Sequence, residues 1–227
     1  MTHHKFIHRM QLNPGGNFYY LFVGLLLILI SMSLSPLLAS VGRFPMTLLF
    51  CLFMLVAIWS LAASRLVFHL GTLLMLLISG IVCISTFIGP HPILETGGLL
   101  LMLIFCSISC FIAAGNVFIL HRVDLNSLIG AFCVYLLLGL IWALFYRLLL
   151  VFDLAKFSGT IAAGGHELFA DLVYFSFVTL ASLGYGDISP IGGLARTLAY
   201  LEAITGQFYL AVMVASLVGV YSANRKQ

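Results

Sequence analysis

Six long apolar runs dominate the sequence and decide what it can fold into. They cover residues 18–39, 45–63, 66–88, 97–120, 125–151 and 194–222. A helix needs about 20 apolar residues to cross about 30 Å of hydrocarbon, and each run is long enough to do so. Only 7% of the residues are charged, against about 25% in a soluble domain. We therefore predict an all-α membrane protein with six transmembrane helices.

The distribution of charge predicts how these helices are oriented. An even number of crossings places both termini on one side, and basic residues favour the cytoplasmic side. The basic residues that fall on the same face as the termini are Lys5, Arg9, Arg65, Arg122, Arg225 and Lys226. We expect cytoplasmic tails at 1–17 and 223–227 in a plasma membrane, which in a bacterium is the inner membrane, with membrane lipids as partners.

Composition also argues against several other classes of function. The net charge is only +3 and the basic residues are scattered, so no nucleic-acid surface is predicted. The five cysteines lie in apolar runs, where a thiol packs as a small hydrophobic group. We find no metal-ligand cluster, nucleophile motif or phosphate-binding loop. The chain is predicted not to be an enzyme and to need no cofactor.

A shorter, broken stretch lies between the last two runs, from Asp153 to Gly193. Within it, residues 166–181 can form a helix of about four turns, with Glu167 and Asp171 suited to its N-terminal end. Such a helix is too short to cross the membrane, so it should enter and stop partway. Residues 182–186 are then non-helical backbone at membrane depth, which is tolerated only where protein or a water-filled path satisfies its polar groups.

A cation path would satisfy these polar groups. Gly184 and Gly186 permit backbone angles that other residues resist, so successive carbonyl oxygens can face one axis. Rings of carbonyl oxygens can replace the hydration shell of K⁺. One chain supplies a single edge of such a ring, so we predict a homotetramer with K⁺ on its axis.

The segment Gly184-Tyr-Gly-Asp187 resembles the selectivity filter of the potassium channel family, which usually reads Thr-Val-Gly-Tyr-Gly-Asp. Ser182 stands where the family usually has Thr, and Leu183 where it usually has Val. The resemblance implies that K⁺ is coordinated by the backbone carbonyls of Ser182 to Gly186 and by the Ser182 hydroxyl. It divides residues 122–222, the pore domain, into an outer helix (125–151), a pore helix (166–181), a filter (182–187) and an inner helix (194–222).

The resemblance also implies residues that support the filter. Tyr174 and Phe175 are placed to brace Tyr185. Asp187 is expected to stabilise the filter from behind, with capping of the turn into Pro190 as the alternative. Glu202 is an intramembrane carboxylate, which marks a functional candidate by default; we expect it to form hydrogen bonds behind the pore helix.

Gly206 falls on the inner helix where many relatives have a hinge glycine. A glycine lowers the cost of bending a helix, which suits a gate, but small residues also allow helices to pack closely in membranes. Leu210, Val214 and Val218 follow at helical spacing and are predicted to line the pore, unless they face lipid.

The first four helices, within residues 18–121, match the potassium channel family in number only. Residues 97–120 contain no Lys, Arg, Asp or Glu. Because steep voltage dependence requires charge that moves through the field, this fourth segment cannot be an arginine-rich voltage sensor, and weak voltage dependence is predicted.

The sequence thus predicts a K⁺-selective channel that conducts passively. One alternative is a weakly selective cation channel, motivated by Ser182 and Leu183. A second is a non-conducting membrane sensor or scaffold that keeps the pore fold.

Overall fold

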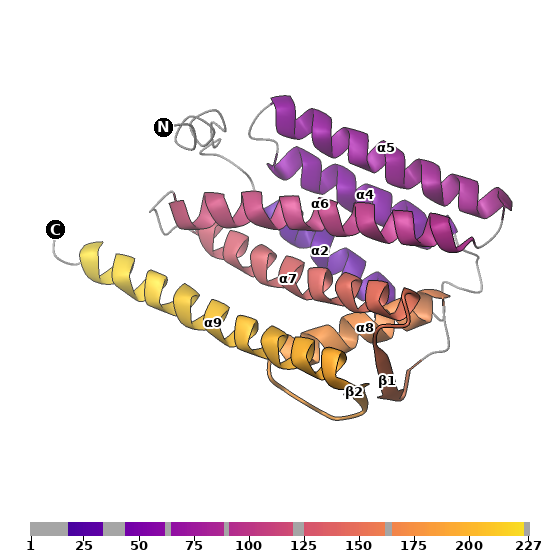
Figure 1. The fold of residues 1–227 in the computed structure, drawn as a ribbon. Helices are drawn as coiled ribbons and strands as arrows, with labels where there is room; N and C mark the ends of the chain where they lie inside the picture. Colours follow the sequence, from indigo (N-terminus) through magenta and orange to yellow (C-terminus); the bar gives the residue numbers. More distant parts are fainter. Residues whose placement is uncertain are drawn as a thin grey trace, which may run out of the picture.

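The apolar runs fold into helices in the computed structural model, which describes residues 18–33, 44–61, 65–88, 91–119, 125–161 and 165–224. The elements, shown in Figure 1, are α2 (Phe18–Ser33), α4 (Phe44–Leu61), α5 (Arg65–Ile88), α6 (Pro92–Ile119), α7 (Leu125–Val151), β1 (Lys156–Gly159), α8 (Gly165–Leu180), β2 (Ile188–Ile191) and α9 (Gly193–Asn224). The predicted N-terminal tail and residues 225–227 of the C-terminal tail lie outside the described residues.

Each predicted transmembrane run overlaps one of these helices, but the helices differ in length. In the described part of the chain, four apolar windows are long enough to cross a membrane: Phe68–Ser85, Pro92–Val117, Leu125–Val151 and Gly193–Ser216. Two shorter apolar stretches are Phe18–Met32 and Cys51–Leu61. The chain is therefore a largely helical membrane protein, and a total of six crossings remains a prediction.

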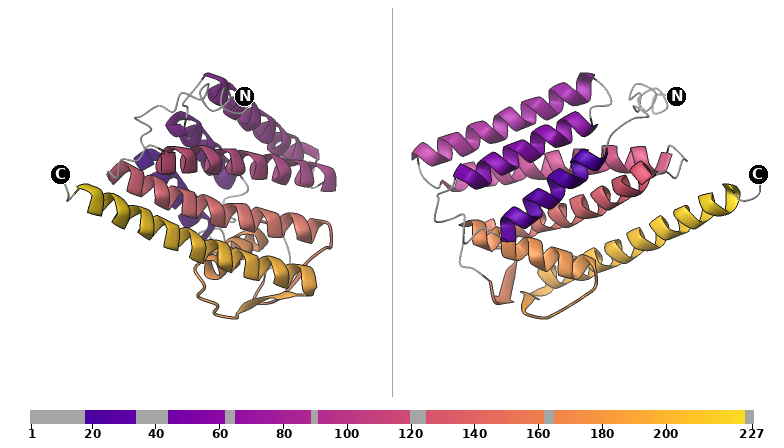
Figure 2. Two further views of the ribbon diagram at one scale, coloured as in Figure 1. Left: turned by 60° about the vertical axis from the view of Figure 1, so that its left-hand side comes forward. Right: turned by 180° about the vertical axis from the view of Figure 1, so that it is seen from behind.

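Helix α7 lies at the centre of the molecule. Helices α6 and α2 pack against it, α4 packs on α2, and α5 lies outermost against α4 and α6. Helix α9 lies apart from this group and contacts α7, α8 and β2. Figure 2 shows this separation from two further directions, with α5 and α9 at opposite sides of the bundle. The peripheral helices are thus packed directly onto the outer helix of the predicted pore domain.

Helix α8, the predicted pore helix, has 16 residues and is about 24 Å long at 1.5 Å per residue, shorter than the hydrocarbon layer. It spans Gly165–Leu180, within one residue of the predicted 166–181. It packs against α7 and α9. The inner helix also agrees with the prediction, although it begins at Gly193 and continues through residues 223 and 224, which were expected in the tail.

Strands β1 and β2 depart from the all-α prediction. They pair in antiparallel register, with Lys156 opposite Ile191 and Gly159 opposite Ile188. The pair joins the segment after α7 to the segment after the filter loop, and Figure 1 shows it beside one end of α8. The pairing gives hydrogen-bond partners to the backbone N–H and C=O groups of an otherwise irregular connection. Because unpaired backbone groups are costly, this explains why the two strands form.

Helix α6 begins earlier than the sequence suggested. The prediction started this apolar run at Gly97, whereas the structure starts the helix at Pro92. Proline suits the first helical position, and an acidic side chain, Glu95, suits the first turn. The fourth helix is therefore not free of charge, which corrects the prediction.

Candidate functional site

The filter loop begins where α8 ends in a defined cap. The N–H of Ser182 donates to the carbonyl of Thr179 at 2.9 Å, and the N–H of Leu183 donates to that of Val178 at 2.9 Å. This pair of bonds is the Schellman motif, in which the residue after the helix adopts the left-handed conformation. Ser182 does so, with φ of 56°, although glycine is the usual choice there. The cap turns the chain out of the helix and into the loop.

Left-handed backbone recurs at alternate residues of this loop. Ser182, Gly184 and Gly186 have φ of 56°, 62° and 81°, whereas Leu183 and Tyr185 do not have positive φ. Alternation of left-handed residues with residues of negative φ can gather successive N–H groups on one side and leave the carbonyl groups to the other. Glycine is favoured at 184 and 186 because it adopts positive φ without a steric cost. The alternating φ is thus compatible with a row of carbonyl groups that face one way.

The carbonyl groups of this row are unsatisfied within one chain. Those of residues 182–185 accept no hydrogen bond from any residue that the structure describes. Residues 182–187 are exposed, with Tyr185 at 68%. A row of bare carbonyls is costly at membrane depth unless water, another chain or a cation meets it.

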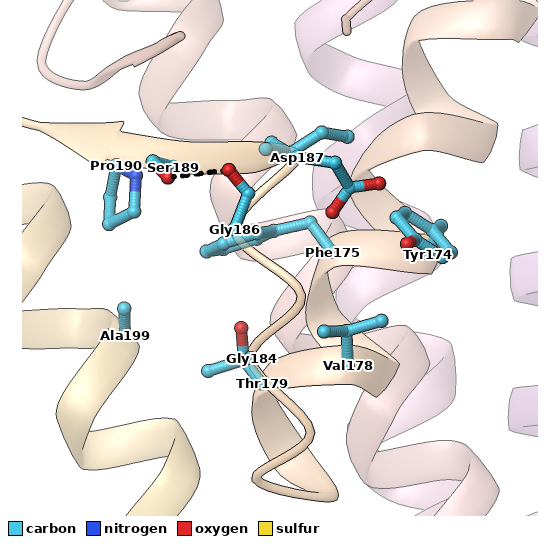
Figure 3. A pocket seen from close by; sticks show the side chains of 11 residues that line it. Tyr174, Phe175, Val178, Thr179, Gly184, Gly186, Asp187, Ser189, Pro190 and Ala199 are labelled. Carbon is cyan, nitrogen blue, oxygen red and sulfur yellow. Dashed lines mark hydrogen bonds between the residues drawn. The ribbon is translucent and has the colours of Figure 1, made fainter. Parts of the chain in front are cut away.

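The outer end of the loop is held by the strand pair. The Asp187 carbonyl accepts a hydrogen bond from the N–H of Thr160 at 3.0 Å, and the Gly186 carbonyl accepts one from the Ser189 hydroxyl at 3.4 Å. Figure 3 shows the latter bond and the Asp187 carboxylate directed toward Tyr174. The nearby carboxylate raises the pKa of the Tyr174 hydroxyl, chiefly as a hydrogen-bond acceptor. Asp187 and Tyr174 therefore lie beside one another next to the loop. The sequence named each of them as a support of the filter without predicting that they meet, and these supporting roles remain predictions.

A hollow of about 210 Å³ lies between the loop and its supports. It is lined by Tyr174, Val178 and Thr179 of α8 and by Gly184 and Gly186 of the loop, which Figure 3 shows from close by. Within one chain, open space therefore remains between the loop and the elements around it.

Phe175 supports this region differently from the prediction. Its ring meets Tyr146 of α7 at 5.3 Å and Phe157 of β1 at 5.1 Å between centroids. Among the described residues, no ring contact joins Tyr185 to Tyr174 or Phe175. Phe175 thus belongs to an aromatic cluster behind α8, and the bracing of Tyr185 remains a prediction for the assembled channel.

Glu202 of α9 is fully buried and joins three helices. Its carboxyl accepts a hydrogen bond from the Tyr146 hydroxyl at 2.7 Å, and its Oε1 lies 2.5 Å from the hydroxyl of Ser176 on α8. The sequence predicted hydrogen bonds behind the pore helix, and the structure places Glu202 there. Tyr146 and Ser176 were not predicted, because nothing in their own sequence context marks them as its partners.

The protons of this network can be counted. The Ser176 hydroxyl also lies 2.7 Å from the carbonyl of Gly139, which can only accept. Since a hydroxyl carries one proton, Ser176 cannot donate to Gly139 and Glu202 together. Both short contacts are satisfied when Glu202 carries a proton and donates it to Ser176. The side-chain amide of a glutamine at position 202 could make the same two contacts.

Gly206 lies against the end of the pore helix. A Cβ atom built there would be 2.0 Å from the carbonyl oxygen of Leu180, closer than any side chain can approach. This supports the packing role that the sequence left open for Gly206, and the hinge role remains a prediction. The next residue, Gln207, donates to the Ser182 hydroxyl at 3.0 Å; sequence analysis missed it.

The predicted pore-lining residues follow on α9. Val214 is exposed in the single chain and Leu210 is half-buried, whereas the side chain of Val218 lies outside the described residues. These positions agree equally with a pore and with a lipid-facing surface.

Arg147 is a further residue that was not predicted. It pairs with Glu95, joining α7 to α6. Arg147 lies near the end of α7, and Glu95 lies in the first turn of α6. A lone arginine near the end of an apolar run can be recognised in the sequence, since charged residues in membrane helices are paired or reach toward the water interface.

Two apolar helices that flank a half-length helix and a loop of bare carbonyls define a membrane channel. A family model described as "Ion channel" matches residues 131–223, from α7 to the end of α9. Among curated proteins, Protein LctB of Bacillus caldotenax is 37% identical over 101 residues, which cover 43% of this chain and 75% of LctB. Protein LctB of Geobacillus stearothermophilus is 36% identical over the same lengths and shares. The chain therefore belongs to this ion channel family.

A third relative matches a shorter stretch. The inward rectifier potassium channel Kirbac3.1 of Paramagnetospirillum magnetotacticum is 52% identical over 50 residues, 22% of this chain and 17% of that channel. No solved structure gives a significant match.

Proposed function

We propose that this ion channel is selective for K⁺ and conducts it passively across the plasma membrane. The ion is coordinated by the carbonyls of Ser182, Leu183, Gly184 and Tyr185, with the Ser182 hydroxyl at the innermost position. Asp187, Tyr174, Phe175 and Glu202 hold the loop and the pore helix in place.

The row of bare carbonyls with alternating φ carries this proposal. Its geometry and its lack of partners among the described residues fit a dehydrated cation as the missing partner. The Gly-Tyr-Gly-Asp sequence at 184–187 and the match to a potassium channel favour K⁺. Because each chain has one such loop, four chains are needed to surround the ion, and the exposure of the loop in a single chain fits this homotetramer.

Weak voltage dependence is part of the proposal. The charged residue of α6, Glu95, is paired with Arg147. Helix α6 also packs along α7, so it offers neither free charge nor an independent path of movement. Currents from bilayers held at a series of potentials would contradict this if they rose e-fold within a few millivolts.

A weakly selective cation channel is the second candidate, since Ser182 and Leu183 stand where the potassium channel family usually has Thr and Val, and Leu183 is 58% exposed in the single chain. The test is flux through purified protein in liposomes, with K⁺ or Na⁺ as the permeant ion, beside Gly184→Ala. Alanine resists the left-handed backbone of residue 184 and should abolish flux. Gly193→Ala is the control, because residue 193 has no positive φ and open space around it.

We expect flux of K⁺ but not of Na⁺. This flux should be lost in Gly184→Ala and kept in Gly193→Ala. Equal flux of both ions would replace the proposal with weak selectivity. An intact tetramer without flux at any potential would favour a sensor or scaffold.

A further inference from the structure

Ser182 is the residue of the filter loop whose side chain contacts the inner helix. The Gln207 amide nitrogen lies 3.0 Å from its hydroxyl oxygen. The contact depends on Gly206, since α9 can approach the end of α8 only where it has no Cβ. Both partners are exposed in the single chain, so the hydrogen bond lies on the side of the loop that is open to other chains and to solvent.

The chemistry of the pair explains why a donor is useful at this position. A serine hydroxyl has one proton and two lone pairs. Gln207 uses one lone pair, which leaves the second available to an ion and the proton free to turn elsewhere. The amide therefore fixes the direction of the hydroxyl without removing it as a ligand.

The residue type at 182 explains why a restraint is needed. Threonine is stiff about χ1 because its Cβ is branched, and serine lacks that branch. An exposed serine at a left-handed cap is free to rotate unless a neighbour holds it. Gln207 is the neighbour that does so.

We propose that Gln207 is a positioning residue of the innermost ion site. Four such amides, one from each subunit, hold the four Ser182 hydroxyls toward the ion and take over the role that a β-branched side chain would have. The inference rests on the proposed function, because it needs an ion at this end of the loop.

The test compares K⁺ and Na⁺ permeability in Gln207→Met, which keeps the length of the side chain and removes its hydrogen bond. The ratio of K⁺ to Na⁺ permeability should fall about tenfold, equivalent to about 1.4 kcal/mol. Each of the four subunits loses one hydrogen bond, and each loss frees the direction of a hydroxyl without removing that hydroxyl as a ligand. Phe208→Leu is the matched control, since Phe208 is the next residue, is 68% exposed and touches none of the site.

A second pair of variants separates positioning from a merely structural role. Adding Gln207→Met to Ser182→Thr should change the ratio by less than about twofold relative to Ser182→Thr alone, because the branched side chain restrains itself. The comparison is made with Ser182→Thr because threonine is strained at the positive φ of residue 182, and that strain is common to both variants. If Gln207→Met does not assemble, Ser182→Ala probes the same contact from the other side and should lower the ratio by a similar factor.

An unchanged ratio in Gln207→Met would overturn the inference while leaving K⁺ selectivity intact. A loss of the same size when Gln207→Met is added to Ser182→Thr would also overturn it. A wild-type channel that passes both ions equally would instead contradict the proposed function, and the inference with it.

Discussion

Two neighbouring residues of α7 face different parts of the molecule. Tyr146 is fully buried and donates its hydroxyl to Glu202 of α9, on the pore side. Arg147 pairs with Glu95 of α6, on the peripheral side, where the two side chains are 15% and 43% exposed. Helix α7 therefore separates a buried hydrogen-bonded network from a partly exposed ion pair.

This difference indicates which side of α7 should be more sensitive to substitutions that lower stability. A buried polar group that loses its partner costs its full desolvation penalty, and a network loses more than one bond when a shared member is removed. A partly exposed ion pair contributes little, because water and salt already screen it. Stability should therefore depend on the pore side of α7 far more than on the peripheral side.

The largest effect is expected at Glu202. Glu202→Leu removes the acceptor of Tyr146 and the partner of Ser176, and should lower the free energy of unfolding by about 3 kcal/mol. Glu202→Gln should cost less than about 1 kcal/mol, because its amide accepts from Tyr146 and donates to Ser176, as a protonated acid does. The measurement is thermal unfolding in detergent. If the Gln variant is as unstable as the Leu variant, the network requires a charged carboxylate.

Gly206 should show the second-largest effect. Gly206→Ala forces a Cβ into the carbonyl of Leu180, and overpacking of this kind costs about 2 kcal/mol. Gly219→Ala on the same helix is the matched control, since the space around residue 219 is open and alanine favours a helix. Unfolding midpoints of the two variants give the comparison. Equal midpoints would mean that α8 and α9 lie further apart.

The smallest effect is expected on the peripheral side of α7. Glu95→Gln should cost at most about 1 kcal/mol, and the loss should shrink in 1 M KCl, where charges are screened beyond about 3 Å. The double variant Glu95→Gln/Arg147→Gln should unfold close to the wild-type midpoint. A loss at Glu95 as large as that in Glu202→Leu would remove the distinction between the two faces.

The helices and the position of the filter loop could be predicted, because both depend on local sequence. Long apolar runs can satisfy their backbone in lipid only as helices, so α7 was predicted with its observed bounds, Leu125–Val151. The loop was recognisable from Gly184 and Gly186, whose positions require positive φ.

The strand pair and the polar contacts could not be predicted with the same means. Strand β2 contains Pro190, which argues against a strand in sequence, and its partner lies about 30 residues earlier. Glu202 stood out as a carboxylate in an apolar helix, but Tyr146, Ser176 and Gln207 gain their roles only when separate helices meet. Arg147 is the exception, because a lone arginine in an apolar run can be recognised from the sequence alone.

The close approach of Gly159 to the filter loop has an evolutionary consequence. Residue 159 has φ of 106°, and a Cβ there would lie 1.8 Å from the carbonyl oxygen of Asp187. Gly159 lies outside the filter segment 182–187, yet the backbone of that segment leaves no room for any residue but glycine at position 159. Homologues that alter this connection must change the outer end of the loop as well, so the two segments are expected to diverge together rather than drift independently.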